Sequence, residues 1–112
     1  MVEAIATKLE DVRSLCQKHG VVRLWLFGSA VKPGVRFDAD SDFDFLVEFD
    51  RKHVPLRGFS DPFWQLLMDL EEVLGRRIDL VELRPFKDPH FAAELEHTRQ
   101  LIYETAPAQT PL

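Results

Sequence analysis

LWLFGSAVKPGVRFDADSDFDFLVE, residues 24–48, contains two apolar segments joined by a polar loop, and the rest of the chain supports these two segments. The first segment begins at residue 21, and the nearly unbroken apolar character of residues 21–27 (VVRLWLF) predicts an interior strand. Apolar residues alternate in residues 43–49 (FDFLVEF), which predicts a second strand that buries one side: Phe43, Phe45, Val47 and Phe49. The loop is too short for a crossover helix, so the two strands are expected to pair antiparallel.

Three helices and a third strand are predicted around this pair. Apolar residues recur at helical spacing in residues 2–19 and 60–74. Residues 76–83 (RRIDLVEL) predict the third strand, and residues 88–104 predict a helix whose inner side carries Phe91, Leu95, Thr98 and Ile102. The resulting order predicts an α/β (α+β) fold with a small mixed or antiparallel sheet flanked by helices.

Short signals mark the helix ends and one buried position. Ser60-Asp61 predicts the cap of the second helix, with Pro62 in its first turn, and Gly75 predicts its end. Cys16 lies on the apolar stripe of the first helix, and we expect a small core residue there rather than a nucleophile.

Length and composition limit the class of protein. The chain has 112 residues, 46% of them hydrophobic, which suffices for one core. We predict one domain at residues 1–104 and a disordered tail at residues 105–112 (TAPAQTPL). No apolar run is long enough for a transmembrane helix, and the N-terminus lacks the apolar region of a secretory signal.

Charge and cysteine content narrow the setting. The net charge of −5 argues against a broad basic surface for nucleic acid, so an anionic ligand would need bound cations or local basic groups. Cys16 is the only cysteine, so no internal disulfide can form, and the cytoplasm is the expected location.

The most informative polar residues are acids at the head of the second strand. Asp42 and Asp44 lie two apart, so their side chains leave the same face of a strand and repel each other unless a cation lies between them. Magnesium prefers carboxylate oxygens and keeps positions open for phosphates. Asp79, an acid within an apolar strand where an unpaired carboxylate would be costly, is the best third ligand. Three such acids could hold two metal ions about 3.5–4 Å apart, as phosphoryl or nucleotidyl transfer requires.

A small-residue turn after the first strand complements these acids. Gly28 lets a phosphate approach the backbone closely, and the Ser29 hydroxyl adds a donor. Lys32, three residues further on, could neutralise a phosphate.

Other interpretations fit the residues less well. The turn lacks the spacing of a Walker P-loop. An EF-hand beginning at Asp38 would place Phe43 where glycine is required and Phe49 where glutamate is required. The plainest alternative is a polar loop whose acids are merely solvated, with Gly28 as an ordinary turn residue. The combination of Gly-Ser, Asp-x-Asp and an in-strand aspartate makes that alternative the weaker one.

LFGSAVKP followed by SDFDFLVE resembles the minimal nucleotidyltransferases of the DNA polymerase beta superfamily. Their pattern is an apolar strand, Gly-Ser, a spacer and Ser-Asp-x-Asp, with a third acid in a later strand of the type found at residues 78–81 (IDLV). The resemblance covers residues 5–104 and implies a polymerase-beta-like nucleotidyltransferase fold.

The chain departs from this family pattern in two places. A spacer of ten residues, common in the family, would select Asp40 and Asp42 as the acid pair, whereas a spacer of twelve selects Asp42 and Asp44. We prefer the latter, because Ser41 then precedes the pair and because a two-residue loop insertion costs little. Lys32 occupies the region where the family often has arginine, which keeps the charge but loses the bidentate geometry.

The resemblance implies a magnesium-dependent transfer of AMP from ATP to an acceptor hydroxyl, with release of pyrophosphate. Asp42 and Asp44 would bind two magnesium ions, and Asp79 would bind the catalytic one and help to activate the acceptor. Gly28, Ser29 and Lys32 would hold the triphosphate.

Similar minimal proteins often work beside a small helical partner of the HEPN type, in a hetero-oligomer. The resemblance therefore implies an antitoxin that adenylylates a HEPN-type toxin. The alternative is an antitoxin that neutralises its partner by binding alone. Among the other polar and aromatic residues, Trp64 is expected in the core, with a partner interface as the alternative. Arg51 is expected to lie in a solvated loop, and His19 to be a surface or packing residue.

Overall fold

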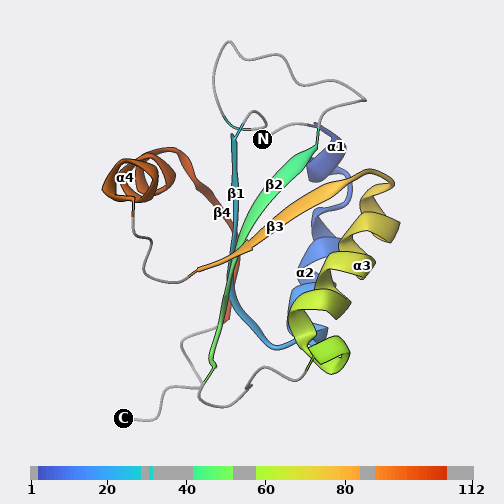
Figure 1. Cartoon of the computed structure of the whole chain (residues 1–112). Helices are drawn as coiled ribbons and strands as arrows, with labels where there is room; N and C mark the ends of the chain where they lie inside the picture. Colours follow the sequence, from blue (N-terminus) through green and yellow to red (C-terminus); the bar gives the residue numbers. More distant parts are fainter. Residues whose placement is uncertain (1–2, 29–30, 32–41, 52–57, 84–87, 106–112) are drawn as a thin grey trace, which may run out of the picture.

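A four-stranded mixed sheet with the strand order β3-β2-β1-β4 forms the centre of the computed structural model (Figure 1). The structure describes residues 3–28, 31, 42–51, 58–83 and 88–105. The strands are β1 (Val21–Phe27), β2 (Phe43–Phe49), β3 (Ile78–Glu82) and β4 (Gln100–Glu104). β1 pairs antiparallel with β2 and β4, and β2 pairs parallel with β3. The predicted α+β class and the antiparallel pairing of the first two strands are confirmed.

Helices lie on both sides of this sheet. α2 (Leu9–Lys18) and α3 (Pro62–Leu74) lie against one face, and α4 (Pro89–Thr98) lies on the other side (Figure 1). A short helix α1 (Glu3–Ala6) precedes α2, and a 3-10 turn η2 (Gly58–Ser60) precedes α3. Within the described residues, no helix is long and apolar enough to cross a membrane.

The continuous helix predicted at residues 2–19 is wrong. Its pattern is interrupted between α1 and α2, where the N–H of Lys8 donates to the carbonyl of Ile5 three residues earlier, at 3.0 Å, instead of four. The side chain of Ile5 is fully buried in the same core as Val12 and Cys16. Apolar side chains of α1 and α2 are therefore buried in one core although a tight turn separates the two helices, and the spacing of apolar residues does not reveal this turn.

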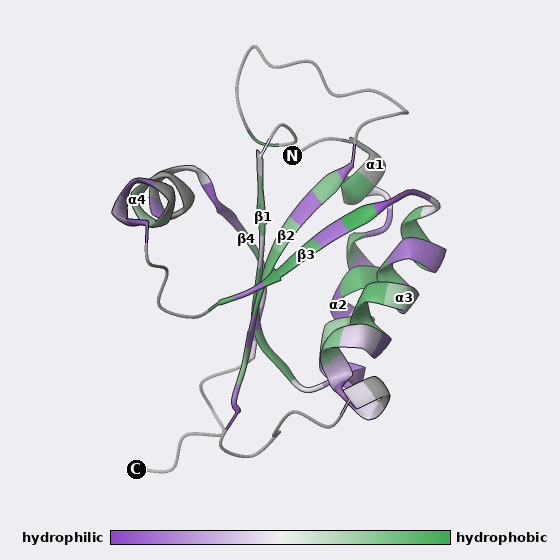
Figure 2. Ribbon diagram, in the orientation of Figure 1, coloured by the Kyte–Doolittle hydropathy of each residue, from purple (hydrophilic) through white to green (hydrophobic). Residues whose placement is uncertain are grey.

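Alternation along the strands divides the buried side chains between the two faces of the sheet. The face toward α2 and α3 carries the main core, which includes Phe43, Phe45, Val47 and Phe49 as predicted. Apolar faces of α2 and α3 turn toward it (Figure 2). A smaller cluster on the opposite face is built on Trp25 and Leu46. Cys16 is a core residue, as predicted, and burial raises the pKa of its thiol to about 12.

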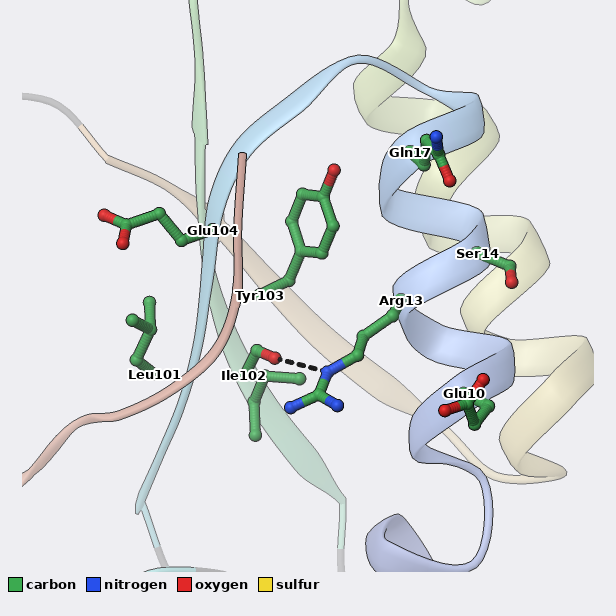
Figure 3. A pocket seen from close by; sticks show the side chains of 8 residues that line it. All are labelled: Glu10, Arg13, Ser14, Gln17, Leu101, Ile102, Tyr103 and Glu104. Atoms are coloured by element: carbon green, nitrogen blue, oxygen red, sulfur yellow. Dashed lines mark hydrogen bonds between the residues drawn. The ribbon is translucent and has the colours of Figure 1, made fainter. Parts of the chain in front are cut away.

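The prediction of a helix through residue 104 is also wrong, because α4 ends at Thr98 and residues 100–104 form β4. Ile102, expected on the inner side of a helix, is buried as part of this edge strand. The pairing of β4 with β1 is irregular, with a register shift between Leu24 and Trp25. A hydrogen bond also joins β4 to α2, since Arg13 Nε donates to the Ile102 carbonyl at 3.1 Å (Figure 3). In so short a segment helical spacing and strand alternation are hard to separate, and pairing with β1 decides the outcome.

Hydrogen bonds between β1 and the chain after β4 extend to Thr105, one residue past the predicted domain boundary at residue 104. Thr105 N–H donates to the Val22 carbonyl at 2.9 Å, and Thr105 Oγ1 donates to the Val21 carbonyl at 2.7 Å. The remainder of the predicted tail, residues 106–112, lies outside the described residues.

The start of α3 is attached to the sheet through a buried charge cluster. Asp61 caps the helix by accepting from the Phe63 N–H at 2.9 Å, and Gly75 ends it with φ +65°, both as predicted. The guanidinium of Arg51 donates to both carboxylate oxygens of Asp61 at 2.9 and 3.0 Å and to those of Glu82 in β3 at 2.6 and 2.7 Å. Arg51 therefore bridges β2, α3 and β3, and the expectation of a solvated loop residue is wrong.

A second polar contact joins α2 to α3 and gives a pH-dependent stability. His19 Nε2 lies 2.7 Å from Oδ2 of Asp69, and this hydrogen bond, assisted by Lys18, lowers the pKa of Asp69 below its ordinary value of 3.8. A carboxyl group whose pKa is lowered by folding stabilises the protein above its unfolded pKa and loses that effect as the pH falls through the folded pKa.

We therefore expect Asp69→Asn to lower the free energy of unfolding at pH 7, and we expect this difference to shrink as the pH falls below about 4. Urea unfolding at a series of pH values measures the difference. Glu72→Gln, a neutralisation at an exposed position of the same helix, is the control. A difference that stays constant from pH 7 to pH 3 would contradict this account of the contact.

Candidate active site

Gly28 and Asp44 are in direct contact where β1 ends and β2 begins. Phe27, the last residue of β1, is the register partner of Asp44. Gly28 follows with φ +75°, and a Cβ atom built on it would overlap Oδ2 of Asp44 and come within 3.0 Å of its Cγ. Only glycine therefore fits this position without displacing the carboxylate.

The parallel pairing of β2 with β3 brings two of the predicted acids side by side. Asp44 and Asp79 are register partners, and adjacent strands lie about 4.8 Å apart. Asp42 precedes β2, and by alternation its side chain leaves the sheet on the same side as that of Asp44. The structure thus brings Gly28, Asp42, Asp44 and Asp79 together at one end of the sheet, on the face opposite α2 and α3.

Exposure differs among these carboxylates. Asp44 is half-buried, whereas Asp42 and Asp79 are exposed to solvent. Asp79 lies in an apolar strand but, contrary to the prediction, needs no partner there, since water solvates its carboxylate. Its place beside Asp44 comes from the register of β2 and β3 instead.

These acids supply the oxygen donors that magnesium prefers. Three carboxylates are the donors that a hard divalent cation prefers, and the backbone places all of them on one face. As their side chains stand, however, no group of three acidic, histidine or cysteine residues in the described part of the chain could hold a metal ion. Asp42 and Asp79 are exposed, so their side chains can turn toward Asp44 without repacking the core. The donor set and the backbone fit magnesium, and side-chain rotation would have to complete the site.

Three other candidate residues cannot be placed. Ser29 and Lys32, predicted to hold the triphosphate, lie outside the described residues, as does Asp40 of the alternative acid pair. The structure does show that Asp44, and not Asp42, is level with Asp79.

One basic residue near the acids was missed by the sequence analysis. Arg99, between α4 and β4, places its guanidinium carbon 4.3 Å from the centroid of the Trp25 ring, on the face that carries the aspartates. The incorrect helix at residues 88–104 hid this position, and no local motif marks it.

Two open hollows lie elsewhere, along the edge between α2 and β4. The first has a volume of about 520 Å³ and is lined by polar and apolar side chains of both elements, among them Arg13, Gln17 and Tyr103 (Figure 3). The second, of about 630 Å³, continues past Gly20 to Thr105. The residues that line them include none of the aspartates, so these hollows are separate from the candidate active site.

Comparison with known proteins decides the family. The model of the family described as polymerase beta nucleotidyltransferases matches residues 10–108. The chain belongs to this family. The nucleotidyltransferase is 34% identical over 103 residues to a protein of Methanocaldococcus jannaschii named "Putative protein adenylyltransferase", a match that covers 85% of this chain and 96% of the relative.

Solved structures agree with this assignment. A structure described as a putative minimal nucleotidyltransferase is 33% identical, with a TM-score of 0.67, and the match covers 88% of this chain and 92% of that one. A complex of a tri-AMPylated HEPN toxin with its MNT antitoxin, from Shewanella oneidensis, is similar in fold, with a TM-score of 0.61 at 18% identity and a match over 93% of this chain and 76% of that one. The predicted polymerase-beta-like nucleotidyltransferase fold is confirmed.

Proposed function

We propose that this nucleotidyltransferase uses magnesium and ATP to transfer AMP to a hydroxyl group on a small helical partner of the HEPN type, and that it thereby acts as an antitoxin. The observation that carries this proposal is the register of Asp44 with Asp79, with Gly28 packed against the Asp44 carboxylate. The relative named as a protein adenylyltransferase supports AMP transfer to protein. The solved complex of an AMPylated HEPN toxin with an MNT antitoxin supports the class of partner.

Each site residue has a role in this proposal. Asp42, Asp44 and Asp79 would hold magnesium, which when bound would offset the charge that develops on the phosphates. Gly28 leaves room for the Asp44 carboxylate and for phosphate oxygens near the backbone, and Ser29 and Lys32 would bind the triphosphate. Asp79, exposed on β3, would accept the proton of the acceptor hydroxyl.

The bond changes balance without any further reactant. The acceptor oxygen forms a bond to the α-phosphorus, and the bond from that phosphorus to the oxygen bridging to the β-phosphate breaks. Pyrophosphate leaves with the electron pair, and AMP remains on the partner as a phosphodiester.

The direct test uses ATP labelled at the α-phosphate, incubated with magnesium, the purified protein and the helical protein that copurifies with it. We expect label on the partner, and we expect none with an Asp42→Ala/Asp44→Ala variant whose circular dichroism matches wild type. Full transfer by that folded double variant would overturn the assignment of these acids.

A second candidate function is neutralisation of the partner by binding alone. Trp64 and Met68 favour it, since they lie one helical turn apart on α3 and are 49% and 64% exposed, which is unusual for such large apolar side chains. A stable complex with no transfer of label to protein or RNA, and with equal affinity for the double variant, would select this function over the first.

A further inference from the structure

Arg99 shares a face of the sheet with the three aspartates. Trp25, on which its guanidinium stacks, packs with Leu46 and Phe27 in the smaller apolar cluster. Leu46 lies two residues after Asp44 in β2, so the side chains of both leave the sheet on the same side. The cation is therefore on the side of the acids and not on the side of α2 and α3.

Arg99 is also close to the acids along the strands. Trp25 is the register partner of Leu46, and Phe27 is the register partner of Asp44. Trp25 precedes Phe27 by two residues, a rise of roughly 7 Å along β1. A triphosphate held at the aspartates can extend over this distance toward the indole ring and the guanidinium above it.

The surroundings of Arg99 differ from those of Arg23, a second arginine on this face. Arg23, at the far end of β1, donates to Glu48 at 2.8 Å and to Glu104 at 2.6 Å, so its charge is already paired. Arg99 is half-buried against Trp25, and among the residues that the structure describes it has no carboxylate partner. A half-buried cation that has no counter-charge within the described ranges, and that lies beside the proposed site for an anionic substrate, is positioned to bind that anion.

We propose that Arg99 is a substrate-binding residue that contacts the β- and γ-phosphates of the nucleotide, an inference that rests on the proposed function. Stacking on the indole ring orients the guanidinium plane and leaves its N–H groups for phosphate oxygens. A planar guanidinium can donate two parallel hydrogen bonds to a phosphate, which the ammonium of lysine cannot.

Titration calorimetry with MgATP and with AMP tests this contact without any acceptor. We expect Arg99→Met to raise the Kd for MgATP by about 10- to 100-fold, the loss expected for hydrogen bonds to a charged group. The Kd for AMP should be unchanged, and Arg99→Lys should fall between wild type and Arg99→Met. Methionine keeps an apolar cover on Trp25, so the fold should be retained.

A matched control and a direct readout complete the experiment. Arg23→Met removes the same charge from the same face and should leave the Kd for MgATP unchanged. In a Trp64→Phe background, where Trp25 is the only tryptophan, inorganic tripolyphosphate should change the fluorescence of the Arg99 protein and not that of the Arg99→Met variant.

The outcomes separate this inference from the proposed function. An unchanged Kd for MgATP in a folded Arg99→Met variant, or a wild-type protein that does not bind MgATP, overturns the role of Arg99. Equal losses for MgATP and AMP also overturn it, because the contact would then lie outside the β- and γ-phosphates. Weakened MgATP binding in a protein that transfers no label supports Arg99 while the proposed function fails.

Discussion

Gly28→Ala is expected to reduce AMP transfer by about a hundredfold or more while the protein remains folded. The added Cβ atom would overlap Oδ2 of Asp44, so the carboxylate would have to move away from the position that it shares with Asp79. Displacement of a reacting group by about 1 Å can cost two orders of magnitude in rate. Asp44→Asn, which removes the charge of the same carboxylate instead of displacing it, should cost at least as much in the label-transfer assay.

A second glycine of similar conformation, Gly20, is a control that distinguishes displacement of the Asp44 carboxylate from strain in the backbone. Gly20 has φ +70°, close to the +75° of Gly28, but an added Cβ atom would meet nothing within 4 Å. Gly20→Ala should therefore share the backbone cost of about 1–2 kcal/mol and retain transfer activity. Equal activities of the two alanine variants, at equal melting temperatures, would show that the contact between Gly28 and Asp44 does not matter for transfer.

Arg51→Ala is expected to lower the free energy of unfolding by about 3–5 kcal/mol, the usual cost of removing one partner of a buried ion pair. Asp61 is fully buried, and Glu82 is 11% exposed at its side chain, so neither carboxylate can replace the guanidinium with bulk water. Removal of Arg51 also uncovers Phe49, because the guanidinium carbon of Arg51 lies 5.0 Å from the centroid of the Phe49 ring. Domains of this size have a total stability of about 5–15 kcal/mol, so urea unfolding would detect the change easily.

Two further variants identify the cause of that loss. Arg23→Ala breaks two ion pairs at more exposed side chains and should cost less than about 1 kcal/mol. Asp61→Ser in the Arg51→Ala background should recover part of the stability, since serine still caps α3 but introduces no buried charge. If Arg51→Ala costs no more than Arg23→Ala, the buried cluster does not hold α3 to the sheet.

Much of the fold was predictable where a signal is local. Alternation along β2 identified its buried side, and the cap at Asp61 with the stop at Gly75 identified α3. The aspartates were found because acids at a spacing of two, at the head of an apolar strand, form a local pattern. In contrast, β4 was missed because residues 100–104 have no distinctive pattern and become a strand only by pairing with β1.

The amino-acid sequence alone was enough to identify which residues of β2 face the core, where α3 begins and ends, and which acids were candidates for a metal site, because each of these depends on neighbours a few residues apart. The tertiary structure was needed to show that Asp44 is level with Asp79 and that Gly28 touches Asp44. It was also needed to show that Arg51 pairs with Asp61 and that Arg99 stacks on Trp25. These contacts join segments far apart in the chain. Their geometry depends on strand register and on packing between elements, which no local pattern of residues specifies.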